Sequence, residues 1–101
     1  MNTENLTQTV KERFDYESAK QVLKEKYEAK MLFALSGGMW CANPELITLL
    51  TAFSTDDIVI CDTYGNPCQV NRTELLHSAK ERYQEQMNAW VNEYDEVSRQ
   101  R

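Results

Sequence analysis

The N-terminal part of the chain has a periodic pattern of apolar residues over positions 16–27, which predicts an amphipathic helix. Its apolar positions are three or four residues apart: Tyr16, Ala19, Leu23 and Tyr27. Asp15 stands immediately before them and is a residue type that caps the N-terminus of a helix. Residues 1–12 are polar, and we expect them to fray.

The C-terminal segment, residues 72–101, has the longest helical pattern. Asn71 and Glu74 form a capping box at its start, and neither Gly nor Pro follows. Apolar residues then recur at the spacing of a heptad seam: Leu76, Tyr83, Met87, Trp90, Tyr94 and Val97. A chain of 101 residues seldom needs so long a helix for its own core. We therefore expect part of this seam to face a neighbouring subunit.

Two apolar runs in the first half of the chain predict β structure. Residues 31–35 suit a buried strand, residues 36–38 interrupt it with Gly37 and Gly38, and residues 39–42 resume the apolar pattern. This segment is either a hairpin or one strand that bends sharply at the glycines.

A short helix is expected after these strands. Asn43, Pro44 and Glu45 stand in the order of a helix start, with a capping amide, a proline in the first turn and an acid that complements the helix dipole. Residues 46–53 continue as a short helix, although their β-branched residues leave a strand possible.

Residues 58–61 and 68–71 are two further strand-like runs, and the polar segment between them predicts a second hairpin. Gly65 can adopt the left-handed backbone of a tight turn, and Pro67 cannot donate to a strand ladder. If Tyr64 and Gly65 form a two-residue turn, Cys61 and Cys68 lie directly opposite each other.

Charge is distributed unevenly along the chain. The net charge is −5, and residues 31–71 contain no Lys or Arg, against Glu45, Asp56, Asp57 and Asp62. Phosphate neutralisation dominates the binding of duplex DNA, so this pattern argues against a protein that grips long duplexes, but not against recognition of a few unstacked bases. No apolar run approaches the roughly 20 residues that span a bilayer, and the N-terminus lacks the order of a secretory signal. We expect a cytoplasmic protein without membrane contact.

The polar residues form no recognisable catalytic or metal-binding constellation. Cys41, Cys61, Cys68 and His77 lack the spacing of a zinc knuckle or ribbon. No basic residue stands beside a cysteine to activate a thiolate, and the single histidine has no evident nucleophile. We therefore expect a non-enzymatic protein with reduced thiols, no cofactor and no metal.

The second hairpin resembles the first signature of the Sm-like (Sm and LSm) RNA-binding family. In that signature an apolar strand ends in Asp, an aromatic residue or His follows two positions later, and Asn follows four positions later. Asp62, Tyr64 and Asn66 have this spacing. The resemblance implies that Asp62 orients the hairpin tip, Tyr64 stacks on a base and Asn66 bonds to a base edge. The family's second signature, an Ile-Arg-Gly type of turn, is missing, and only Arg72 is near enough in sequence to replace its arginine.

As a whole, the chain is similar to a family of small proteins from ocean metagenomes attributed to tailed cyanophages. Segments 62–67 and 81–90 carry this similarity. It implies an Sm-like fold and a place in the cytoplasm of an infected bacterial host.

We expect a single α+β domain over residues 1–101. It would contain a small, strongly bent antiparallel sheet, or partly open barrel, of Sm-like type with an N-terminal and a long C-terminal helix. The leading hypothesis is a homo-oligomeric ring of about five to seven subunits that binds single-stranded RNA or other nucleic acid through Asp62, Tyr64, Asn66 and Arg72. The alternative is a phage protein-interaction module in which the C-terminal helix is the binding surface and nucleic acid plays no part.

Overall fold

The computed structural model describes residues 3–99, with side chains from residue 15 onward, as an α+β arrangement. Over these residues it has three helices and two antiparallel sheets of two strands each. The elements follow in the order α1 (Thr3–Lys30), β1 (Leu32–Leu35), β2 (Gly38–Cys41), α2 (Pro44–Ala52), β3 (Asp57–Cys61), β4 (Pro67–Asn71) and α3 (Arg72–Arg99). The expected α+β class and the long C-terminal helix are confirmed.

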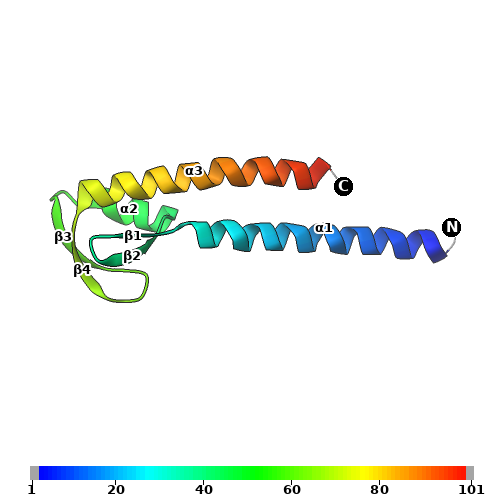
Figure 1. Ribbon diagram of the computed structural model, residues 1–101, viewed down its shortest axis with the longest axis horizontal. Helices are drawn as coiled ribbons and strands as arrows, with labels where there is room; N and C mark the ends of the chain where they lie inside the picture. The colour runs from blue at the N-terminus through cyan, green and yellow to red at the C-terminus, as the bar shows by residue number, and fades with distance from the viewer. Residues whose placement is uncertain (1–2, 100–101) are drawn as a thin grey trace.

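The molecule is elongated because its two long helices extend together beyond the β structure. Figure 1 shows α1 and α3 running antiparallel as a helix pair, with β1 to β4 and α2 gathered at one end. We call that end, residues 31–71, the head. The extents are 66 × 23 × 20 Å and the Cα radius of gyration is 19.3 Å. A compact chain of this length would have a radius of gyration of about 13 Å.

The N-terminal helix is longer than the sequence pattern indicated. It begins at Thr3, so Asp15 lies inside α1 and does not cap it. α1 includes most of the segment that we expected to fray, residues 1–12, of which residues 1 and 2 lie outside the described part. No Gly or Pro interrupts the first thirty positions, so nothing in the local sequence ends the helix before Lys30.

The first pair of strands is a hairpin, which resolves the choice left open by the glycines. Leu35 pairs with Gly38, so Ser36 and Gly37 form a two-residue loop. Both loop residues have positive φ, 52° and 78°, as a type I′ turn requires. On the face of this hairpin that packs against the core, Trp40 is only 1% exposed, and its indole N–H donates to the Leu35 carbonyl at 2.9 Å.

The segment after this hairpin is a helix, as its start signals predicted. The Asn43 side chain accepts a hydrogen bond from the Leu46 N–H at 2.8 Å, and Pro44 occupies the first turn. The last strands pair as the second hairpin, with Asp57 opposite Asn71 and Cys61 opposite Pro67.

The two hairpins form separate sheets rather than one continuous bent sheet. In residues 3–99, β1 pairs only with β2 and β3 only with β4, and no closed barrel forms. In the chain, α2 lies between β2 and β3. The hairpins instead contact each other through the tip of the second one, as described below.

The head has one hydrophobic core to which four elements and α3 contribute. Its buried residues are Trp40, Leu50, Ile58, Val70 and Leu75. On α3 the fully buried residues are Leu75 and Ala79, whereas Leu76 of the predicted seam is only half-buried. The head therefore closes around the first turns of α3.

Beyond the head, α1 and α3 contact each other along their length. Leu23 and Tyr27 of α1 are buried. The rings of Tyr27 and Trp90 stack with centroids 5.9 Å apart and planes 7° apart. None of the helices, over the described residues, contains a stretch long and apolar enough to cross a membrane.

Candidate functional site

The tip of the second hairpin is a three-residue loop of Thr63, Tyr64 and Gly65 rather than the expected two-residue turn, because the Asp62 N–H donates to the Asn66 carbonyl at 2.9 Å. Cys61 pairs with Pro67, and Cys68 pairs with Ile60. Gly65 has φ of 80° and supplies the left-handed residue that ends such a loop. The expectation that Cys61 and Cys68 lie directly opposite is therefore wrong by one residue. A shift of one residue places their side chains on opposite faces of the hairpin.

The Asp62 carboxylate organises this tip and fixes it to the first hairpin. Its Oδ1 accepts hydrogen bonds from the N–H groups of Tyr64 at 3.1 Å and Asn66 at 2.8 Å. Its Oδ2 accepts a hydrogen bond from the Met39 N–H at 3.1 Å, across the gap to β2. The Met39 bond, followed by the Asn66 bond, holds the pKa of Asp62 below its usual value. The Thr63 N–H also donates to the Met39 carbonyl, at 2.8 Å.

Tyr64 and Asn66 are the tip residues that face solvent. Tyr64 is 69% exposed, and Asn66 is also exposed. An aromatic ring this open can stack on a planar ligand, and an amide beside it can donate to and accept from a base edge. The structure thus brings Asp62, Tyr64 and Asn66 together. The Asp62 carboxylate is occupied by hydrogen bonds from backbone N–H groups of the protein.

Arg72 is not brought to this tip. It lies at the start of α3, at the opposite end of β4 from Pro67. Its guanidinium donates to the carbonyls of Thr55 at 3.1 Å and Leu50 at 3.3 Å, and Nη2 lies 3.5 Å from the Asp56 carboxylate. These contacts tie the end of α2 to the start of α3 and leave the Arg72 side chain 20% exposed. The fixed cation therefore neutralises the carbonyl end of α2.

A polar cluster in the helix pair was not identified from sequence. The Glu93 carboxylate accepts a hydrogen bond from the Tyr27 hydroxyl at 2.5 Å and from Lys26 at 2.8 and 3.0 Å. The Lys26 bond is the main reason that the pKa of Glu93 lies below its usual value, and the bond to Glu93 raises the pKa of Tyr27. No local motif links residues so far apart, because only the antiparallel packing of α1 and α3 brings them together.

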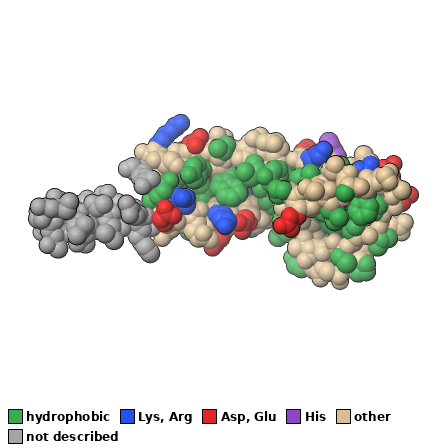
Figure 2. Space-filling view, turned by 180° about the vertical axis from the view of Figure 1, so that it is seen from behind, with side chains coloured by type: hydrophobic (Ala, Val, Ile, Leu, Met, Phe, Trp, Pro, Cys, Tyr) green, Lys and Arg blue, Asp and Glu red, His purple; other side chains and the backbone are tan. Residues whose placement is uncertain are grey.

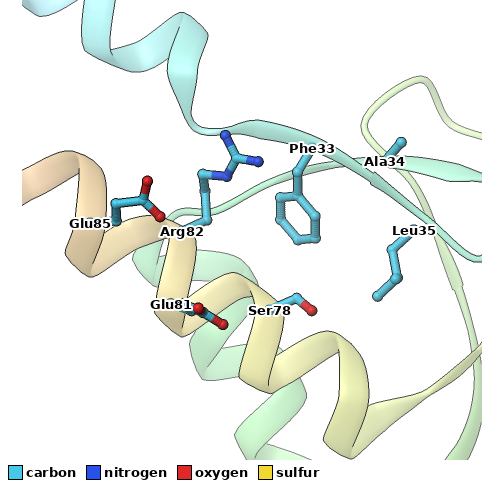
Figure 3. A pocket seen from close by; sticks show the side chains of 7 residues that line it. All are labelled: Phe33, Ala34, Leu35, Ser78, Glu81, Arg82 and Glu85. Carbon is cyan, nitrogen blue, oxygen red and sulfur yellow. The ribbon is translucent and has the colours of Figure 1, made fainter.

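An open groove between β1 and α3 was also absent from the sequence-based expectations. Figure 3 shows its apolar wall from β1 and its polar wall from one face of α3. Its volume is about 320 Å³, and it is lined by Phe33, Ala34, Leu35, Ser78, Glu81, Arg82 and Glu85. Arg82 donates to the Lys30 carbonyl at 3.4 Å. Glu81 and Glu85 are the acidic residues of the lining, and Glu81 Oε2 lies 3.4 Å from His77 Nε2.

An apolar surface lies along one face of α3. We call it the α3 stripe: Tyr83, Met87, Val91 and Tyr94. Their spacings of four, four and three residues place them on one face of the helix. Val91 is 49% exposed and Tyr94 38% exposed, and the other two are half-buried. Three stripe residues, Tyr83, Met87 and Tyr94, belong to the predicted heptad seam. The third aromatic residue of that seam, Trp90, instead stacks on Tyr27 of α1.

Among residues 15–99, no group of His, Cys, Asp and Glu side chains is arranged to hold a metal ion. Burial is the main cause that raises the pKa of the Cys41 thiol, which disfavours the reactive thiolate. Comparison with protein-family models, curated proteins and solved structures gives no match to this chain.

Proposed function

We propose that this protein is a non-enzymatic protein–protein interaction module whose binding surface is the α3 stripe. The observation that carries the proposal is the exposure of Val91 and Tyr94 on an apolar face of α3 whose other two members, Tyr83 and Met87, are half-buried. Large apolar side chains aligned on one face differ from single exposed residues, because a contiguous patch gains free energy when a partner covers it.

The packing of the helix pair supports this proposal. Two helices in contact cover one side of each helix only, and α3 uses that side for Trp90 and Glu93. Figure 2 shows hydrophobic side chains gathered along one face of the helix pair, continuing toward the head. An aromatic-rich helical face of this kind suits the apolar face of another helix.

Binding of the dye anilinonaphthalene sulfonate tests whether the α3 stripe is an accessible apolar surface. The folded protein, at concentrations at which its mass is that of a monomer, should bind the dye and enhance its emission. Val91→Glu should reduce that enhancement, whereas Val22→Glu should not. Val22 is 66% exposed on α1 and serves as the matched control. Absence of dye binding, or equal loss in both variants, would refute the proposed surface.

A second candidate function is the binding of single-stranded RNA by the hairpin tip, and the exposure of Tyr64 favours it. In this alternative the protein is an Sm-like ring of about five to seven subunits, from a cyanophage, acting in the host cytoplasm. Repeated copies of Tyr64 and Asn66 would supply the stacking and hydrogen bonds. The ring would have to multiply weak contacts, because residues 31–71 carry no Lys or Arg and Arg72 is bound internally.

Fluorescence anisotropy with labelled oligo-U and oligo-A RNA separates the two candidates. The interaction module should not change the anisotropy of either RNA, even at low salt. Saturable binding that is weakened by Tyr64→Ala and by Asn66→Ala would instead establish the tip as an RNA site. Val59→Ala is the control for these variants, because Val59 is equally open on β3 but lies outside the tip.

A further inference from the structure

The α3 stripe is bracketed by two opposite charges. Lys80 stands three residues before Tyr83, and Asp95 stands four residues after Val91, so both lie at the ends of the same face. Fifteen residues separate them, which is about 22 Å along a helix. Among the residues with described side chains, neither Lys80 nor Asp95 has an ion-pair partner.

The exposed centre of the stripe, Val91, lies away from the polar contact that joins α1 to α3. Glu93 is two residues from Val91 and so about 200° around the helix from it. Glu93 meets Lys26 of α1 on that far side, and Val22 lies one turn from Lys26. The charges at the ends of the stripe are therefore free to meet a partner without disturbing the helix pair.

We propose that the occupant of the α3 stripe is a second copy of this chain, docked antiparallel through its own α3 stripe. The inference rests on the proposed function and names its partner. In the antiparallel arrangement Lys80 of each copy meets Asp95 of the other, and Tyr83 of each meets Tyr94 of the other. A two-fold symmetric contact of this kind uses the same surface on both copies.

Charge selects this orientation over the parallel one. A parallel dimer places Lys80 beside Lys80 and Asp95 beside Asp95, and like charges in register are destabilising. The second half of α3 adds to this repulsion, because no Lys or Arg follows Arg82 until Arg99 and four acidic residues lie between them: Glu85, Glu93, Asp95 and Glu96. In the antiparallel dimer, the acidic second half of each α3 lies beside the first half of α3 of the other copy, which carries Lys80.

Mass measured by light scattering over a range of protein concentrations tests the dimer. The unmodified chain of 11.8 kDa should approach twice its mass as concentration rises. Val91→Glu should weaken the dimer by at least about tenfold, because it places a carboxylate in the apolar contact. Val22→Glu, the same substitution on the opposite side of the helix pair, should leave the dissociation constant unchanged.

A charge exchange tests the orientation. Lys80→Glu and Asp95→Lys should each weaken the dimer by a few-fold, because each leaves two like-charged contacts. The double variant, Lys80→Glu with Asp95→Lys, should recover the original dissociation constant. Recovery is expected only if residues 80 and 95 of different copies meet. Circular dichroism of each variant establishes that its helices are intact.

A monomeric mass at every concentration would overturn the inference, as would a double variant no stronger than the single ones. An oligomer that is insensitive to Val91→Glu would also overturn it and would favour the ring. The dye experiment distinguishes failure of the dimer from failure of the proposed function. A monomer that still binds the dye in a Val91-dependent manner would retain an interaction surface for another protein.

Discussion

At the scale of single residues, Asp62 shows how a side chain expected to serve a ligand can serve the fold. Its two oxygens receive three backbone N–H groups, one from the other hairpin and two from its own loop. The family resemblance implied that Asp62 orients the tip, and these bonds describe how it does so. The resemblance could not indicate Met39 as a partner, because the contact depends on how the two hairpins pack.

Replacement of Asp62 by Asn should lower stability in a pH-dependent manner. The folded pKa of Asp62 lies below its usual value of about 3.9, so its contribution is present above that pH and is lost as pH falls through the folded pKa. In urea denaturation, the unmodified protein should be more stable than Asp62→Asn at pH 7, and the difference should shrink below about pH 4. A difference that is constant across this range would contradict the assignment.

Gly38 provides a second test at this scale, because it permits a close approach between the hairpins. A Cβ at this position would lie 3.0 Å from the Cys68 sulfur and 3.0 Å from the Trp40 ring. Gly38→Ala should therefore reduce the free energy of unfolding by about 1–3 kcal/mol through overpacking. Cys68→Ala removes one of the two obstacles, so adding it to Gly38→Ala should recover part of the loss. Equal stability of Gly38→Ala and the unmodified protein would contradict this packing.

At the scale of elements, local sequence signals located most of the helices and strands but not their exact limits. The start of α2 was predictable because Asn43 and Pro44 act locally: the Asn43 side chain accepts from the Leu46 N–H, and Pro44 lies in the first turn. The register of the second hairpin was not, because it depends on Gly65 occupying the third loop position rather than the second. The start of α1 was also predicted wrongly. Asp15 is a residue type that caps helices, but it lies inside α1, where no Gly or Pro interrupts the helix before it.

The helix pair should depend on the Glu93 cluster, which joins α1 to α3. Glu93→Ala removes the acceptor for both Tyr27 and Lys26 and should lower the melting temperature. The pKa of Glu93 is depressed in the folded protein, so this difference should be present at neutral pH and disappear as acid protonates the carboxylate. Far-UV circular dichroism monitors the melting. Glu96→Ala, an exposed acid on the same helix, should melt like the unmodified protein.

At the scale of the whole molecule, the elongated shape separates this protein from a compact domain of the same length. The sequence indicated two helices of different length, and so it gave no reason to expect that they would pair along most of their extent. Tyr27 and Trp90 were both assigned to apolar faces, but their contact depends on the head turning the chain back on itself. Tertiary packing of this kind leaves no signal in local periodicity.

Small-angle X-ray scattering should detect both the shape and its assembly. The dilute protein should have a radius of gyration near the 19.3 Å of the Cα trace, rather than the roughly 13 Å of a compact chain. As the antiparallel dimer forms, the radius of gyration should increase, because the two heads then lie at opposite ends. A radius near the compact value in dilute solution would contradict the extended helix pair.

The division into head and helix pair also distributes the two tryptophans, one to each part. Trp40 lies in the centre of the head, and Trp90 stacks on Tyr27 in the helix pair. Each indole therefore reports on its own half of the molecule when the other is replaced by Phe. Emission from the two single-tryptophan proteins would reveal whether the halves melt as one cooperative unit or whether the helices separate while the head stays folded.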